Sequence, residues 1–442
     1  MAMRRISVAV LISLGLAVSG CGIFKGGKKT PTTVGERIPI LTYESKAEAE
    51  AELQGTTVVL PLEEARADWG QPGGTPDKSN GHLSWSGALE RVWTASIGSG
   101  SSSTRRLNAA PVVHRGRVFT IDTMGEVRAF DARTGGLAWS DKIRLKGQAQ
   151  GIAFGGGVSA DNGRVFATTG FGILVAYDAS QGVELWRATV PVPLRGAPTV
   201  AGDRLFVMSQ DNQLFAFDVE TGSQLWNVTG TVEVAGLLGA GAPAVALGTV
   251  VVGFGSGELT ALRAENGRTV WSDALTRTGR ATAMAALSDI DASPVIDRGR
   301  VFAIGHGGRM AALEIATGQR VWERNFAGVW TPWVAGEFIY TVTLEGELLC
   351  LTRSEGKVRW VTELDRWKNP KKKTKPIYWA GPVLGSEKLL AVSSDKSIVM
   401  VDAYEGKVLK TAKLGAAAYL PPVLAGGLAY VLTDDGRLSA WR

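Results

Sequence analysis

A turn followed by a tryptophan recurs along this chain, and its spacing constrains the fold more than any other feature. The stretch "AFDVETGSQLW" (216–226) has close copies in "AFDARTGGLAW" (129–139) and "AYDASQGVELW" (176–186). The tryptophans that end these and three further copies are separated by 47, 40, 45, 51 and 38 residues, and they are Trp139, Trp186, Trp226, Trp271, Trp322 and Trp360. A repeat of this length without helical periodicity is typical of the four-stranded blades of a β-propeller.

Each repeat unit predicts short strands separated by tight turns. The apolar runs, such as "GRVFTID" and "EVRAFDA" in the first unit, are rich in Val, Phe, Leu and Ile and are bounded by Gly, Asp and Asn. Strands of this composition are buried on both faces, as stacked blades require. In the turn, the aspartate bonds back to the backbone and the glycine adopts a positive φ. The tryptophan that follows supplies a large apolar surface between blades.

Seven full units can be aligned, and two fragments at the ends complete an eighth. The full units span 110–139, 155–186, 197–226, 242–271, 293–322, 331–360 and 381–410, the last with Leu409 where tryptophan is expected. The segment 421–442 holds three strands, whereas "GALERVWTASI" (87–97) is a single strand ahead of the first unit. We therefore predict an all-β fold, an eight-bladed β-propeller over 87–442, closed by pairing of N-terminal and C-terminal strands. Closure leaves no exposed sheet edge.

The first residues have the pattern of an export signal. Arg4 and Arg5 precede an apolar run, and small residues lead to Cys21 in "AVSGC". We predict a secretory signal peptide over 1–20 rather than a spanning helix. The ending resembles a bacterial lipobox, which implies lipidation of Cys21; the alternative is an ordinary signal with an incidental cysteine. Gly22, by resemblance to sorted lipoproteins, favours the outer membrane.

Residues 21–86 are expected to form a lipidated flexible tether. They are rich in Lys, Gly, Pro and Thr, with one short helix expected over 45–54. A lipid at one end and about 60 loose residues suit a protein that reaches a partner near a membrane.

Residue types that carry catalysis or bind metals form no recognisable motif. His82, His114 and His306 lie far apart, without the spacing of zinc sites, and no Gly-x-Ser-x-Gly motif occurs. We therefore expect no catalytic residue and no metal. The one basic cluster, "RWKNPKKKTK" (366–375), is expected to be a solvated loop; the alternative is contact with anionic headgroups or an acidic partner surface. Nucleic acid is not expected as a partner of an exported protein.

The repeat resembles that of quinoprotein dehydrogenases, eight-bladed propellers that hold pyrroloquinoline quinone and calcium in the central channel. That family has an adjacent Cys–Cys pair over the cofactor. This chain has two cysteines, Cys21 and Cys350, which are not adjacent, and it lacks the length for the added active-site loops. The resemblance therefore covers the scaffold, and fold does not imply function. A quinone-dependent dehydrogenase stays open as an alternative, and no bound cofactor is expected.

The combination of export signal, tether and eight-bladed ring resembles the BamB family, propeller lipoproteins of the outer-membrane β-barrel assembly machinery. The most specific match is "ALSDIDASPVI" (286–296), which is similar to a Leu-Ser-Asp-x-Asp loop of that family. There, two acidic residues matter for binding periplasmic domains of the barrel-forming subunit, which implies this role for Asp289 and Asp291. The alternative is that both cap a turn.

A second loop of the family, Leu-x-Leu-Arg-Gly, has two possible matches here. "VPLRGAP" (192–198) contains Leu194 and Arg195, but it lies two blades before the acidic loop, whereas the family places it one blade before. The segment in the expected blade is "VAGLLGAGAP" (234–243), which aligns Leu237, Leu238 and Gly239 and lacks the arginine. We therefore expect an apolar contact from Leu237 and Leu238 beside the two carboxylates; whether another arginine replaces the missing one stays open.

The resemblance implies a non-catalytic scaffold that binds periplasmic domains of the barrel-forming subunit and assists insertion of outer-membrane proteins. Other components of the complex, and unfolded outer-membrane proteins, are further expected partners. The protein is expected on the periplasmic face of the outer membrane, held by its lipid. A scaffold for another envelope complex is the remaining alternative.

Overall fold

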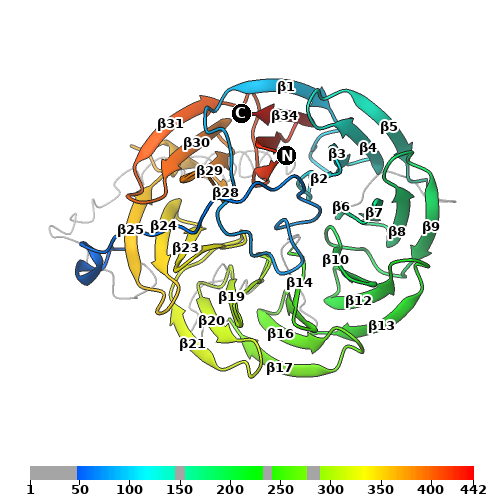
Figure 1. Cartoon of the computed structure of the whole chain (residues 1–442), viewed down its shortest axis with the longest axis horizontal. Helices are drawn as coiled ribbons and strands as arrows, with labels where there is room; N and C mark the ends of the chain where they lie inside the picture. The colour runs from blue at the N-terminus through cyan, green and yellow to red at the C-terminus, as the bar shows by residue number, and fades with distance from the viewer. Residues whose placement is uncertain (1–46, 145–154, 232–240, 276–288) are drawn as a thin grey trace, which may run out of the picture. The chain divides into compact units, whose positions relative to one another are not determined.

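Eight four-stranded antiparallel sheets follow one another around a central channel in the computed structural model, which describes residues 47–144, 155–231, 241–275 and 289–442 (Figure 1). The eight-bladed β-propeller predicted from the repeats is confirmed. In chain order, the first four blades are β2 (Val112–His114), β3 (Arg117–Ile121), β4 (Glu126–Asp131) and β5 (Leu137–Lys142); β6 (Gly156–Asp161), β7 (Arg164–Thr169), β8 (Ile173–Asp178) and β9 (Glu184–Thr189); β10 (Thr199–Ala201), β11 (Arg204–Met208), β12 (Gln213–Asp218) and β13 (Gln224–Thr229); and β14 (Ala244–Ala246), β15 (Thr249–Gly253), β16 (Glu258–Arg263) and β17 (Thr269–Ala274).

The other blades follow the same order from the channel outward. They are β18 (Val295–Asp297), β19 (Arg300–Ile304), β20 (Met310–Glu314) and β21 (Arg320–Arg324); β22 (Trp333–Ala335), β23 (Phe338–Val342), β24 (Glu347–Thr352) and β25 (Val358–Glu363); β28 (Trp379–Gly385), β29 (Lys388–Ser393), β30 (Ser397–Asp402) and β31 (Val408–Lys413); and β32 (Val423–Ala425), β33 (Leu428–Leu432), β34 (Arg437–Trp441) and β1 (Arg91–Ser96). Two short strands, β26 (Trp367–Asn369) and β27 (Thr374–Pro376), form a separate hairpin between blades 6 and 7.

The ring closes in the eighth blade, where the first strand of the chain pairs with the last. β1 runs antiparallel to β34, with Arg91 opposite Trp441 and Ser96 opposite Arg437. The eighth sheet therefore combines strands from the two ends of the propeller, as the complementary fragments predicted. Pairing of this kind leaves the ring without a free sheet edge at its junction.

The repeated turn locks each blade to its neighbour. In the first blade, the Asp131 carboxylate accepts hydrogen bonds from the hydroxyl and amide of Thr134 and the amide of Arg133, which lower its pKa. Gly135 has φ 74°, and a Cβ placed there would lie 2.6 Å from the indole of Trp93 in the preceding blade. Only glycine leaves room for that ring. The Trp93 Nε1 then donates to the carbonyl of Ala132 at 3.1 Å.

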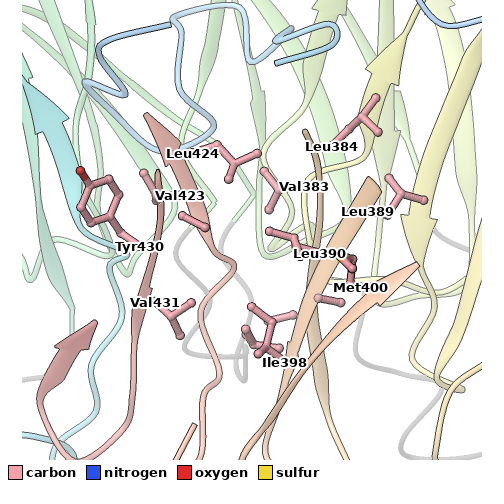
Figure 2. Close-up of a cluster of buried hydrophobic side chains, with 14 of the residues drawn as sticks. Val383, Leu384, Leu389, Leu390, Ile398, Met400, Val423, Leu424, Tyr430 and Val431 are labelled. Atoms are coloured by element: carbon pink, nitrogen blue, oxygen red, sulfur yellow. The ribbon is translucent and has the colours of Figure 1, made fainter. Parts of the chain in front are cut away.

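Apolar side chains fill the space between neighbouring blades. Figure 2 shows this packing where blade 7 meets blade 8, with Val383 and Leu390 from one sheet and Leu424 and Val431 from the next. These four side chains are buried, as are their neighbours on the same strands. Burial of each such side chain stabilises the fold by about 1.5–3 kcal/mol.

The segment predicted as a tether is packed over much of its length, which corrects that expectation. Residues 58–85, which we call the strap, cross the centre of the ring (Figure 1). Val58, Trp69, Leu83 and Trp85 are buried, and the Trp69 and Trp333 rings stack with centroids 6.0 Å apart. The helix expected over 45–54 is a 3-10 turn, η1 (Ala51–Leu53). Residues 21–46 lie outside the described residues.

The strap hydrogen-bonds to every blade in order around the ring. Six of these bonds join its main-chain carbonyls to backbone amides, one uses the Gln71 side chain and one is donated by an indole. They run Gly426 N to Arg66 O (2.8 Å), Val113 N to Trp69 O (2.8 Å), Ala160 N to Gly70 O (2.5 Å), Val200 N to Gln71 Oε1 (3.0 Å), Val245 N to Pro76 O (2.8 Å), Ile296 N to Asp77 O (2.8 Å), Trp333 Nε1 to Gly81 O (2.7 Å) and Ser386 N to Leu83 O (2.8 Å). The strap thus makes one circuit, from blade 8 through blades 1 to 7.

The strap distinguishes the two faces of the propeller. It bonds near the end of each inner strand, where that strand turns into the second strand of its blade. Because the strands are antiparallel, the connections between successive blades lie at the opposite end of the sheets. We call that side the loop face. It carries the connections 190–198, 275–294 and 364–378, and therefore also the predicted site residues Asp289 and Asp291.

Candidate functional site: a buried arginine and two carboxylates

Asp289 and Asp291 meet Arg195 on the loop face. An Arg195 guanidinium nitrogen lies 3.1 Å from Asp291 Oδ1 and 3.9 Å from Asp289 Oδ1. The three residues are 7%, 8% and 1% exposed for Arg195, Asp291 and Asp289. We call them the Arg195 cluster. A buried charge requires a partner, so the three side chains hold one another in place.

The main chain positions each member of the cluster. Arg195 precedes β10, and its amide donates to the carbonyl of Met208 at 2.8 Å. The carbonyl of Asp289 accepts from the amide of His306 at 2.9 Å, and the next amide, Ile290, donates to Phe254 at 3.2 Å. The acidic turn is therefore bonded to blades 4 and 5, while the arginine comes from the entry to blade 3.

An arginine does pair with these carboxylates, although the segment in the expected blade lacks one. Sequence reasoning set Arg195 aside because its loop enters the ring two blades before the acidic loop. In the structure the side chain passes the entry to blade 4 and reaches Asp291. Connections of several blades converge at the channel, so residues separated by a whole blade along the chain can meet there.

The other predicted site residues are not part of the Arg195 cluster as the structure describes it. Leu237, Leu238 and Gly239 lie outside the described residues, as does Cys21. Leu194, beside the arginine, is buried and belongs to the core between blades 2 and 3. Burial also decides how the two carboxylates can act, since neither is open to a partner in this conformation.

The electrostatics of the cluster are unbalanced, with two acids sharing one arginine. Burial raises the pKa of the Asp291 carboxyl to about 6, with Arg195 lowering it and the nearby Asp289 raising it. In the unfolded chain this carboxyl titrates near 3.8. A carboxyl whose pKa rises on folding stabilises the fold below the unfolded pKa, and that contribution is lost as the pH rises through the folded pKa.

We therefore expect the stability of the wild-type chain to fall relative to Asp291→Asn between pH 4 and pH 7. The difference should reach roughly 3 kcal/mol, because each unit of pKa shift corresponds to about 1.4 kcal/mol. Urea unfolding of both proteins at several pH values measures it. Parallel pH profiles for the two proteins would show that Asp291 titrates normally in the fold.

A cavity of about 600 Å³ occupies the channel between the strap and the loop face. Trp69, Lys78 and Asn80 of the strap line it, together with Asp291 and Trp330. Burial lowers the pKa of Lys78 to about 7, and its Nζ donates to the Thr199 hydroxyl at 3.1 Å. The Arg195 cluster thus borders the channel cavity.

Metal-ligating side chains do not gather in this part of the molecule. Within 47–144, 155–231, 241–275 and 289–442, no three His, Cys, Asp or Glu side chains lie close enough together to hold a metal ion. In the same ranges, no helix is long and apolar enough to cross a membrane.

Comparisons with known proteins agree on one family. The family described as "Outer membrane protein assembly factor BamB" matches residues 47–144 and 123–362. Proteins of that name from Moranella endobia and Escherichia coli are 23% and 28% identical to this chain. The alignments cover 79% and 78% of this chain, and 89% and 86% of those proteins, respectively.

Solved structures give the same fold. BamB from Moraxella catarrhalis superposes with a TM-score of 0.69 at 18% identity, covering 80% of this chain and all of that one. Quinohemoprotein alcohol dehydrogenase from Comamonas testosteroni superposes with a TM-score of 0.64 at 15% identity, covering 85% of this chain and 80% of the enzyme. At these identities the likeness concerns the architecture of the ring, which an assembly factor and a dehydrogenase share.

Proposed function

Because this chain belongs to the BamB family of outer membrane protein assembly factors, we propose that it is a non-catalytic scaffold of the outer-membrane β-barrel assembly machinery. It binds periplasmic domains of the barrel-forming subunit through the loop face and assists insertion of outer-membrane proteins. A ring closed at its junction and fastened by the strap is a rigid support, and binding residues are commonly carried on loops of such supports.

The Arg195 cluster is the observation that carries this proposal. A Cβ placed at Gly241 would lie 2.7 Å from the carbonyl oxygen of Asp291, so the backbone after residue 240 passes directly beside the cluster. Asp289 itself directly follows residue 288. The cluster therefore lies where the segments 232–240 and 276–288 join the described ring. Buried charges at that junction hold Gly241 and Asp289, the described residues that follow the two segments.

This geometry supports an indirect role for the two carboxylates. Asp289 and Asp291 position the partner-binding segments, and the contact itself comes from those segments, including Leu237, Leu238 and Gly239. An apolar pair makes an effective anchor when it loses little conformational freedom on binding. The two charged residues are then positioning residues for the interface.

Family membership also supports association with the outer membrane. The signal peptide over 1–20 and lipidation of Cys21 place the protein on the periplasmic face, attached by its lipid. The other components of the complex and unfolded outer-membrane proteins are its further proposed partners. Metabolic labelling with a radioactive fatty acid tests the anchor, since Cys21→Ser should remove the label.

Co-purification from gently solubilised envelopes tests the scaffold function. We expect the tagged wild-type protein to recover the barrel-forming subunit, and Asp289→Ala/Asp291→Ala to recover at least tenfold less. The matched control is Asp161→Ala/Asp203→Ala, which removes two exposed carboxylates on the strap side and should recover the wild-type amount. Circular dichroism shows whether each variant is folded.

The possible results separate the site from the function. Equal recovery by the folded double variant would keep the scaffold function and remove the Arg195 cluster from the interface. Failure of the wild type to recover the subunit would reject the function. Titration with pyrroloquinoline quinone and Ca²⁺ would then test the dehydrogenase alternative.

A further inference from the structure

A lysine-rich hairpin projects from the loop face between blades 6 and 7. β26 and β27 pair antiparallel, with Trp367 opposite Pro376 and Asn369 opposite Thr374. The amide of Ile377 donates to the carbonyl of Arg366 at 2.9 Å and closes the base. The basic cluster predicted as a solvated loop is therefore an ordered element. We call residues 366–376 the basic hairpin.

The charges of the basic hairpin divide into a neutralised base and an uncompensated tip. Arg366 pairs with Glu345, and Lys368 pairs with Asp395 at 2.7 Å. Both acids lie in turns of the loop face, so these bridges fix the hairpin to blades 6 and 7. The tip carries four exposed lysines with no ion pair among the residues that the structure describes: Lys371, Lys372, Lys373 and Lys375.

Aromatic side chains accompany these charges. The guanidinium of Arg366 lies over the Trp367 ring, 5.3 Å from its centroid. Tyr378, just past the hairpin, is 57% exposed. Tryptophan and tyrosine beside lysines are typical of segments at a membrane–water interface. Protein–protein interfaces, in contrast, are depleted in lysine.

The chain enters the propeller beside the same hairpin. The amide of Ala47 donates to the Glu347 carboxylate at 3.3 Å, and Glu347 begins β24 at the loop-face end of blade 6. β25 of that blade leads directly into the basic hairpin. Cys21 is 26 residues before Ala47, and even fully extended residues of that number span at most about 90 Å. A lipid on Cys21 therefore limits the distance between the membrane and the point where the chain enters the propeller, beside the hairpin, to about that length.

We propose that the basic hairpin binds the anionic phospholipid surface of the membrane in which the Cys21 lipid is inserted. This inference rests on the proposed lipid attachment. The lysines contribute electrostatic attraction to phosphate headgroups, and Trp367 and Tyr378 lie at headgroup level. One lipid and one basic patch together give the two signals that stable membrane attachment requires, and the patch sets the orientation of the loop face.

Vesicle sedimentation tests the hairpin without the lipid. The chain from Gly22 to Arg442 keeps every described residue and lacks Cys21. It should bind vesicles of 30% phosphatidylglycerol in phosphatidylcholine at least tenfold more tightly than pure phosphatidylcholine vesicles. Replacement of the four tip lysines by glutamine should lower binding to the anionic vesicles about 20-fold or more, because each lysine near such a surface contributes about 1 kcal/mol.

A matched control separates the hairpin from net charge. The control combines Lys142→Gln, Lys407→Gln, Lys410→Gln and Lys413→Gln. These changes remove the same charge from outer strands and from the turn before β31, and they should leave binding within twofold of wild type. An equal loss in both variants, or wild-type binding that is the same to neutral and anionic vesicles, would overturn the proposal. If vesicle binding is absent and the tip variant instead recovers less barrel-forming subunit, the hairpin binds an acidic protein surface and the membrane proposal is wrong. Normal recovery of that subunit alongside absent vesicle binding would reject the hairpin's role and leave the scaffold function standing.

Discussion

Arg195→Met is expected to lower the free energy of unfolding by about 3–5 kcal/mol, because it removes the ion pair between the arginine and the buried carboxylates of Asp289 and Asp291. Methionine keeps much of the side-chain volume, so the loss reports charge rather than packing. The same variant should release the ends of the segments 232–240 and 276–288, and recovery of the barrel-forming subunit should fall with it. Urea unfolding, monitored by tryptophan fluorescence, measures the first effect.

The control neutralises all three members of the cluster. Arg195→Met/Asp289→Asn/Asp291→Asn leaves no buried charge and should regain most of the lost stability, since replacing a whole buried ion cluster is often close to neutral. It should still recover little of the barrel-forming subunit, because the ion pairs between Arg195 and the two aspartates are gone. If Arg195→Met and the wild type had the same midpoint of urea unfolding, the cluster would have no structural role.

A chain that begins at residue 87 should be less stable than one that begins at residue 46 by roughly 5 kcal/mol or more. The shorter chain loses the strap, and with it the buried side chains of Val58, Trp69, Leu83 and Trp85. Each contributes about 1.5–3 kcal/mol by burial, less the entropy of ordering the segment. The expected result separates a packed strap from a flexible tether, since loss of a tether would leave the unfolding transition unchanged.

Two controls accompany the truncation. The chain from residue 46 should unfold like the chain from Gly22, because it keeps the complete strap. Trp69→Ala in the longer chain should lose about 3 kcal/mol by itself, as removal of a buried tryptophan usually does. A stable, cooperative transition in the chain from residue 87 would contradict the role that the strap contacts imply.

The architecture of the ring was predictable because its determinants are local and repeated. A glycine with positive φ recurs in all seven full units, a tryptophan in six of them and an aspartate in four, and each has a contact that the structure shows in the first blade. The eighth blade was predictable from the number of strands left outside the full units, since three C-terminal strands lacked a fourth and one N-terminal strand lacked partners.

The strap was not predictable from hydrophobic periodicity. Its apolar residues are few and irregularly spaced, and its contacts are mostly backbone carbonyls bonded to amides of the inner strands. Such bonds depend on where the ring presents free amides and not on side-chain type. A segment rich in Gly and Pro therefore has the composition of a linker, although eight sheets bind it.

The candidate site was half predictable. The Leu-Ser-Asp-x-Asp resemblance pointed to Asp289 and Asp291 as residues for partner binding, whereas their side chains are only 1% and 8% exposed. Arg195 was missed because linear blade order was used as a measure of distance. Around a narrow channel, the entry loops of blades 3 and 5 are close enough for an arginine side chain to join them.

The circuit of the strap makes completion of this protein an all-or-none event. Residues 66–85 precede every blade in the sequence, yet their hydrogen-bond partners extend to Ser386 and Gly426. The strap therefore cannot complete its contacts until nearly the whole chain has been synthesised. Because the circuit includes at least one bond to each of eight blades, it fits a ring of eight blades and not a ring of seven or nine. The strap can therefore complete its contacts only in a chain of full length. A chain truncated in its last blades would lack both the β1–β34 pairing and the strap bonds to those blades.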